Sequence, residues 1–308
     1  MWSISAAKTF SRCQRQWYYK NCLSSWNAKD PIRRQAYLLS KLQSISSWRG
    51  NIVDSVISEV VVPALKMRQI PSLISAQQRA TELFERQLKF ACQHPLYQPG
   101  LAPSKIGSDF AVFHCIEYDK KIHKQELEQA KFEINQALIN LFSMPELFSE
   151  LKAAQYLVTQ PPLSFIHTDE PVRAVPDVVA FYSNKPPLII DWKVHTFGVY
   201  RAWKQLGIYA LALSEGKPHK GFPKFSQWKV TEFRLQEIQL LKNKIRSYKL
   251  DEMRIAEIDN FIAESISTIK LILGDAKKST VNPQNLLPAS SPEICQSCNY
   301  RSICWESA

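Results

Sequence analysis

The sequence predicts an α/β protein, and the order of its apolar patterns carries that prediction. Long stretches before residue 152 place apolar side chains at helical spacing. Short runs of Val, Ile, Phe and Tyr follow between residues 155 and 193, bounded by turn-forming residues, as is typical of strands. A further helix and a further strand come next. We therefore expect a sheet encoded by the middle of the chain, with helices before and after it.

The stretch before the sheet is expected to be helical in four places. The predicted ranges are 5–22, 31–67, 73–93 and 123–151, with a break in the second near Gly50. The second range is the clearest, because Ile52, Val53 and Val56 lie on one face of a helix. These ranges predict a helical elaboration over residues 30–150, before the sheet.

The sheet itself is expected to begin at residues 155–160 and 163–167. A hairpin follows over residues 172–193, where two apolar runs flank the turn sequence Ser-Asn-Lys-Pro-Pro. A helix is predicted at 201–213 and another strand at 227–235. Residues 236–274 are predicted to form one or two helices.

Charged residues interrupt both strands of the predicted hairpin. Asp177 breaks the first apolar run, and Asp191 and Lys193 share one face of the second because they are two residues apart. Buried strands rarely contain carboxylates, since desolvating an unpaired charge is costly. Two converging acids suit a divalent cation, and a nearby lysine can orient a water or stabilise charge on a phosphate. The alternative is an ordinary buried hairpin whose acids are ion-paired.

These residues resemble a known signature. Pro176-Asp177, followed after thirteen residues by Asp191-Trp192-Lys193, is similar to the P-D-(D/E)-x-K motif of the restriction-endonuclease-like nuclease superfamily. The resemblance implies a PD-(D/E)XK core with a mixed central sheet and helical insertions. It also implies a phosphodiester hydrolase that depends on Mg²⁺ or Mn²⁺. Asp177, Asp191 and Lys193 would be its catalytic residues, and the main-chain carbonyl of Trp192 a further metal ligand.

Asp54 is a candidate for the third metal-binding side chain. Residues 50–54 resemble the segment of RecB-like nucleases that ends in a metal-binding histidine, and Asp54 occupies the histidine position. Aspartate is a competent ligand for Mg²⁺ or Mn²⁺. The alternative is that Asp54 is a solvated helix residue.

Four residues are candidates for DNA contacts. Gln205 and Tyr209, one helical turn apart, resemble the Q-x-x-x-Y motif of the RecB-like branch and would face a DNA strand near the metal. The alternative is a core tyrosine beside a surface glutamine. Arg12 and Arg15 alternate with aromatic residues in the first helix, a pattern that suits backbone contacts and base stacking but also an ordinary helix.

The cysteines near the two ends form a metal-site pattern. Cys295, Cys298 and Cys304 follow the spacing C-x2-C-x5-C, which suits zinc or an iron-sulfur cluster. The same resemblance pairs an N-terminal cysteine, here Cys13, with this triplet around a 4Fe-4S cluster, as in AddB-type and CRISPR-associated RecB-like exonucleases. It implies an iron-sulfur staple that joins the chain ends. Zinc and free thiols remain the alternatives.

Composition supports a polyanionic partner. The 308 residues have a formal net charge of +11. Apolar runs are too short to span a bilayer and the first ten residues lack the apolar segment of a signal peptide, so we expect a cytoplasmic protein with no membrane association.

The combined expectation is a single RecB-like nuclease domain over residues 1–308, in which 285–308 and Cys13 form an iron-sulfur subdomain. The resemblance implies a DNA exonuclease acting on single-stranded ends, with partners among DNA repair or CRISPR adaptation proteins. The alternative is a catalytically inactive nucleic-acid-binding subunit of such a complex, which the replacement of histidine by Asp54 would support.

Overall fold

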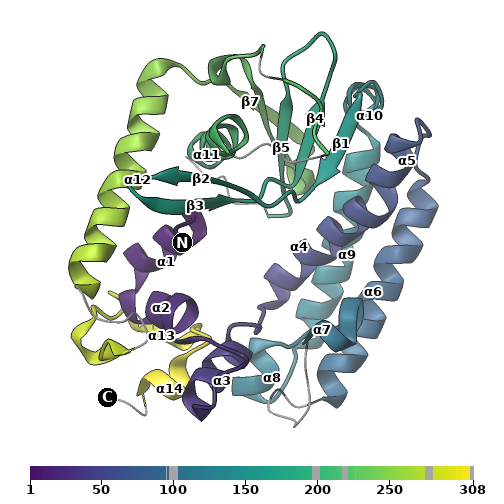
Figure 1. Cartoon of the computed structure of the whole chain (residues 1–308). Helices are drawn as coiled ribbons and strands as arrows, with labels where there is room; N and C mark the ends of the chain where they lie inside the picture. Colours follow the sequence, from purple (N-terminus) through teal and green to yellow (C-terminus); the bar gives the residue numbers. More distant parts are fainter. Residues whose placement is uncertain are drawn as a thin grey trace. The chain divides into compact units, whose positions relative to one another are not determined.

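The structure is a computed structural model that describes residues 1–94, 96, 103–195, 202–216, 221–225, 227–274 and 280–305. The chain divides into two compact units, each built from separate segments. Unit 1 contains Met1, Ile45–Phe84 and Lys124–Ala263; unit 2 contains Trp2–Ser44, Glu85–His123 and Glu264–Ala308. The expected helical elaboration is thus shared between the units (Figure 1).

A five-stranded mixed sheet lies at the centre of unit 1, in the order β1-β4-β5-β6-β7. Its strands are β1 (Tyr156–Thr159), β4 (Val178–Phe181), β5 (Leu188–Lys193), β6 (Arg234–Gln239) and β7 (Lys244–Tyr248). β5 and β6 are parallel, and the other neighbouring strands are antiparallel. The α/β class and the mixed sheet are confirmed.

A separate hairpin precedes β4 and β5 in the chain. β2 (Leu163–His167) and β3 (Glu170–Ala174) pair only with each other, and residues of β2 alternate between buried and exposed. The prediction that residues 163–167 and 172–174 belong to the main sheet was therefore wrong. Pro176 lies between β3 and β4 and has no N–H to donate to a ladder, which helps to separate the two strands.

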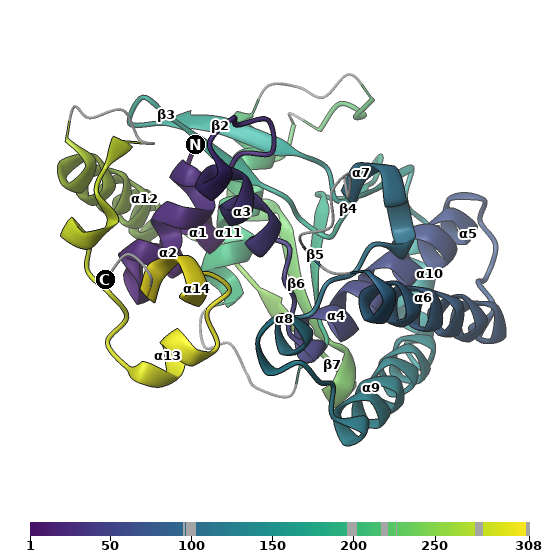
Figure 2. The ribbon, with the colours of Figure 1, turned by 90° about the horizontal axis from the view of Figure 1, so that it is seen from below.

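The helices of unit 1 surround the sheet. They are α4 (Ile45–Val56), a π-helical turn (Ile57–Val61), α5 (Val62–Lys66), the first half of α6 (Leu73–Gln93), α9 (Lys124–Phe142), α10 (Pro145–Lys152), α11 (Ala202–Glu215) and the first half of α12 (Glu252–Leu273). Figures 1 and 2 show α11 on one side of the sheet and α4, α5, α9 and α10 on the other. α11 contacts β5 and β6, and α4 contacts α9.

Two predicted helix boundaries were wrong. The break in the second range lies at residues 40–44 rather than at Gly50, which sits inside α4 with open space around it. The range 123–151 is two helices, because α9 ends before Pro145 begins α10.

Residues 236–239 and 244–248 form strands, joined by a short 3-10 turn, rather than the predicted helix. They contain most of β6 and all of β7. Polar residues at 236, 237 and 239 stand where a strand inside a sheet is expected to be apolar, so the alternation was not recognisable from the sequence.

Unit 2 brings the two ends of the chain together. It contains α1 (Ile4–Arg12), α2 (Gln14–Tyr18), a π-helical turn (Tyr19–Leu23), α3 (Pro31–Leu39), α7 (Pro103–Ile106), α8 (His114–Asp119), α13 (Pro292–Gln296) and α14 (Arg301–Trp305). Tyr19 stacks on Tyr300 with ring centroids 5.6 Å apart, and the main-chain N–H of Gln14 donates to the carbonyl of Leu287.

Cys13 interrupts the predicted helix 5–22. Its backbone is extended, it ends α1, and its thiol accepts a hydrogen bond of 3.3 Å from the N–H of Gln16 at the start of α2. The break therefore fixes the thiol at the start of α2.

Among the described residues, no helix is both long and apolar enough to span a membrane.

Candidate active site

The antiparallel pairing of β4 and β5 brings Asp177 and Asp191 to one end of the pair. Val178 is the register partner of Ile190, so Asp177 immediately before β4 lies beside Asp191. The main-chain N–H of Trp192 donates to Oδ2 of Asp177 at 2.7 Å. Asp191 is only 2% exposed although it is charged, so its position depends on the groups around it.

Lys193 and two residues of α11 surround Asp191. The Lys193 ammonium forms an ion pair with Oδ2 of Asp191. Gln205 Nε2 donates to the other oxygen, Oδ1, at 3.1 Å, and to the hydroxyl of Tyr209 at 2.6 Å. Both residues of the Q-x-x-x-Y motif therefore lie beside Asp191, the acid of β5. Trp192 contacts the site through its main-chain N–H, which donates to Asp177.

Asp54 of α4 interacts electrostatically with Lys193 and Asp191. Burial raises its pKa to about 6; Lys193 acts to lower the pKa, and the carboxylate of Asp191 acts to raise it. Burial also raises the pKa of Asp177 well above the usual range, with Asp191 and then Asp54 as further causes. The carboxyls of Asp54, Asp177 and Asp191 with the ammonium of Lys193 are hereafter the acidic cluster.

The acidic cluster has more negative than positive groups. Burial alone would lower the pKa of Lys193, but the three carboxylates outweigh burial and the pKa is raised. The pKa of Tyr209 is raised by burial and then by Asp191 and Asp177. One lysine cannot neutralise three carboxylates. Carboxylate oxygens with negative charge left over are suitable ligands for Mg²⁺ and Mn²⁺.

The family comparison is consistent with this geometry. The model of the PD-(D/E)XK nuclease superfamily matches residues 1–305. The chain belongs to the PD-(D/E)XK nuclease superfamily. Its members are nucleases, so the superfamily implies a nucleic-acid substrate and phosphodiester hydrolysis.

Other comparisons add little to the superfamily assignment. A solved structure titled "Crystal structure of SSO0001" matches with 14% sequence identity and a TM-score of 0.29, covering 75% of this chain and 98% of that chain. No curated protein matches the chain.

Members of the PD-(D/E)XK superfamily typically use a divalent metal, and the donor atoms here are suitable for one. Among the described residues, however, no three His, Cys, Asp or Glu side chains are arranged to hold a metal ion as they stand. Lys193 already occupies one oxygen of Asp191 and Gln205 the other. Both oxygens of Asp191 therefore already have a partner, and a metal held by this acid would share or replace these contacts.

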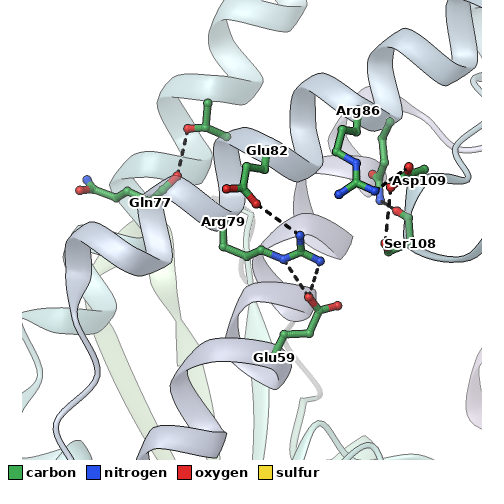
Figure 3. Close-up of polar contacts among 9 residues, drawn as sticks. Glu59, Gln77, Arg79, Glu82, Arg86, Ser108 and Asp109 are labelled. Atoms are coloured by element: carbon green, nitrogen blue, oxygen red, sulfur yellow. Dashed lines mark hydrogen bonds and ion pairs between the residues drawn. The ribbon is translucent and has the colours of Figure 1, made fainter.

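Glu59, a second acid on the same helical stretch as Asp54, has another partner. Figure 3 shows its carboxylate against Arg79 of α6, with Oε2 2.7 Å from Nη2 and 2.9 Å from Nε. Its side chain is 42% exposed. Glu59 therefore takes part in a surface ion pair, whereas Asp54 interacts electrostatically with Lys193 and Asp191 of β5.

Sequence reasoning missed three residues near the acidic cluster. Arg49 of α4 donates to the carbonyl of Val194 and forms an ion pair with Glu133 of α9, which ties the end of β5 to two helices. Glu237 and Gln239 of β6 are fully buried polar residues. Only their departure from apolar alternation in residues 234–239 could have marked them.

In unit 2, the four predicted cluster cysteines line one cavity of about 30 Å³. Burial raises the pKa of Cys298 to about 11; the N–H of Tyr300 acts against the rise, and the thiols of Cys13, Cys304 and Cys295 add to it. The pKa of Cys304 is raised by burial and lowered in part by Arg15. These four residues with their cavity are hereafter the cysteine cavity; Cys22, Cys92 and Cys115 do not line it.

Arg12 and Arg15 have different surroundings. Arg15 donates to the carbonyls of Leu286 at 3.0 Å and Gln284 at 3.4 Å, and it lines the cysteine cavity. Arg12 is exposed and bonds Gln16 within its own helical region. A role in DNA contact stays a prediction for both, and Arg12 is the more accessible of the two.

Proposed function

We propose that this protein is a Mg²⁺- or Mn²⁺-dependent deoxyribonuclease that acts as an exonuclease on single-stranded DNA ends. The acidic cluster carries the proposal, because three acids, one just before β4, one on β5 and one on α4, share one half-buried lysine. The net charge of +11 supports a polyanionic substrate. The resemblance to RecB-like nucleases supports the single-stranded preference and a role in DNA repair or CRISPR adaptation.

Each residue of the site has a distinct task in this proposal. Asp54, Asp177 and Asp191 hold the metal, with the main-chain carbonyl of Trp192 as a further ligand. When bound, the metal polarises the phosphate and makes water a better nucleophile near neutral pH. Lys193 orients the attacking water and stabilises negative charge on the phosphate.

Gln205 and Tyr209 position the DNA strand relative to Asp191. Their mutual hydrogen bond of 2.6 Å keeps the glutamine amide beside the catalytic acid. The amide can turn from Asp191 to a DNA phosphate or sugar once the metal engages the acid. Arg12 and Arg15 contribute basic charge elsewhere on the chain, with Arg12 the better candidate for phosphate contact.

We also propose that Cys13, Cys295, Cys298 and Cys304 bind a structural 4Fe-4S cluster. Four sulfur ligands meet the requirement of such a cluster, and the four side chains line one cavity. The cluster would then staple the two ends of the chain, about 280 residues apart in sequence. Zinc in place of the cluster would preserve the staple and change only the metal.

The test of the proposed function is cleavage of end-labelled single- and double-stranded DNA with Mg²⁺ or Mn²⁺. We expect the wild type to shorten single strands from an end and Asp191→Ala to be inactive, with unchanged circular dichroism showing that it is folded. DNA binding without cleavage by the wild type in either metal would reject the nuclease and favour the non-catalytic subunit.

A further inference from the structure

Two fully buried polar residues on β6 have no role in the mechanism above. Glu237 and Gln239 are both 0% exposed. In the parallel pairing of β5 and β6, Glu237 is the register partner of Asp191 and Gln239 that of Lys193. Register partners on neighbouring strands point to the same face of a sheet. Glu237 and Gln239 therefore share a face with the catalytic acid and lysine.

The orientation of the Gln239 amide is determined by Glu237. Nε2 of Gln239 lies 3.2 Å from Oε1 of Glu237, and a carboxylate only accepts hydrogen bonds, so the nitrogen must be the atom on that side. The other carboxylate oxygen of Glu237 receives the hydroxyl of Tyr248 at 2.9 Å and lies 3.7 Å from Arg246. Tyr248 and Arg246 of the edge strand β7 thus fix the carboxylate of Glu237. This carboxylate in turn fixes the orientation of the Gln239 amide.

The amide oxygen of Gln239 is left without a donor. It is buried, and no described residue donates a hydrogen bond to it. A buried acceptor without a partner is costly, so a donor is expected to reach it, either a water or a neighbouring side chain that moves.

Lys193 needs such an acceptor when metal binds. Its ammonium is paired with Oδ2 of Asp191, and its side chain is only 20% exposed. A divalent cation held by Asp191 would repel the ammonium and compete with it for the carboxylate. A largely desolvated ammonium that loses its acceptor is stabilised by another acceptor nearby, because leaving the charge unpaired is costly.

We propose that Gln239 is a positioning residue that accepts the Lys193 ammonium when metal displaces it from Asp191. The inference rests on the proposed function. Its consequence is that the lysine is held by a neutral group in the metal-bound enzyme, close to the reacting phosphate and away from the acid that binds metal. Glu237 and Tyr248 keep the acceptor in the required orientation.

The test compares two glutamines on the same strand. Gln239→Leu removes the acceptor, and the matched control is Gln236→Leu. Gln236 is the register partner of Ile190 and faces the opposite side of the sheet, and its amide oxygen is likewise buried without a donor among the described residues. Mn²⁺ binding without DNA is measured by calorimetry, and kcat and KM are measured on single-stranded DNA.

We expect Gln239→Leu to weaken Mn²⁺ binding by about tenfold, a typical coupling between interacting groups, and to lower kcat with KM unchanged. Gln236→Leu should change none of these. In a Lys193→Met background no ammonium has to be relocated, so Gln239→Leu should leave Mn²⁺ binding unchanged there. If Gln239→Leu fails to fold, Gln239→Asn retracts the acceptor with less disturbance and should show a smaller effect in the same direction.

Two outcomes would overturn the role of Gln239 alone. One is wild-type Mn²⁺ affinity and kcat in Gln239→Leu; the other is an equal loss of affinity in the Lys193→Met background, which would indicate a merely structural residue. A wild-type protein that neither binds Mn²⁺ nor cleaves DNA would instead overturn the proposed function, and this inference with it.

Discussion

The acidic cluster and the cysteine cavity both gather ionisable side chains, but the charge of these groups is balanced in different ways. Each gathers side chains of the kinds that bind metals from distant parts of the chain, and in each burial raises the pKa of several of these groups. The acids have a half-buried lysine to balance part of their charge. The thiols need no such partner, because a protonated thiol is neutral. In the proposed function, a metal at the acidic site therefore competes with an internal cation, whereas a metal at the cysteine site competes only with protons.

The largest effect is expected when Lys193, the cation of the acidic cluster, is removed. Lys193→Ala should reduce the rate of DNA cleavage by roughly 100- to 1000-fold, because it deletes a group that stabilises charge in the transition state. Mn²⁺ binding should be retained or strengthened, since the internal competitor for Asp191 is gone. Cleavage rate and calorimetric affinity, measured on the same preparation, check both parts. A variant with normal cleavage would remove Lys193 from the catalytic assignment.

Replacing a cysteine tests whether the cysteine cavity binds a metal cluster. Protein purified without air should be brown, and Cys13→Ser or Cys298→Ser should bleach it and lower the melting temperature by removing a long-loop crosslink worth on the order of several kcal/mol. Cys92→Ser is the matched control, because Cys92 is exposed and does not line the cavity. Iron and sulfide analysis gives the ligand count. A colourless wild type with one zinc would refute the cluster and keep the staple.

Asp54 tests whether α4 supplies a metal ligand. Asp54→Ala should weaken Mn²⁺ binding by about tenfold or more and reduce cleavage in parallel, while Asp54→His should preserve part of both. Glu59→Ala is the control, since that carboxylate is engaged by Arg79 on the surface. Equal metal affinity in Asp54→Ala and the wild type would assign the third ligand to another residue.

The raised pKa of Asp54 also predicts a pH dependence without metal. Its folded-state pKa of about 6 exceeds the ordinary value of 3.8, so the folded protein binds the proton more tightly than the unfolded chain. This contribution to stability is present at low pH and is lost as the pH rises through about 6. The melting temperature of the metal-free wild type should therefore fall relative to Asp54→Asn between about pH 4 and pH 6, the range between the ordinary and the raised pKa. Parallel curves for the two proteins would contradict the raised pKa.

The smallest effect is expected at α11. Gln205→Ala and Tyr209→Phe remove one hydrogen-bonding group each, so cleavage should slow by a few-fold to about tenfold and the product lengths should change, with Mn²⁺ binding unaffected. Gel analysis of products over time provides the measurement. Unchanged rates and DNA affinity would make the pair a structural contact with Asp191 only.

The local chemistry of this chain was more predictable than its strand boundaries. Asp177, Asp191 and Lys193 stand out because charge inside apolar runs is expensive, and that argument needs only the sequence. The convergence of Asp54 on these strands could not be derived, since it depends on how α4 packs. The β6 strand was mistaken for helix because Glu237 and Gln239 place polar groups on a buried face. The helix break at Cys13 was hidden because apolar spacing continues through it.

The central claim is that Asp54, Asp177 and Asp191 together bind the catalytic metal. Anomalous diffraction from crystals grown with Mn²⁺ tests it most directly. We expect an anomalous peak about 2 Å from carboxylate oxygens of all three residues, with the Lys193 ammonium no longer on Asp191. A Mn²⁺ peak elsewhere in the crystal, with the Lys193–Asp191 ion pair still closed, would contradict it.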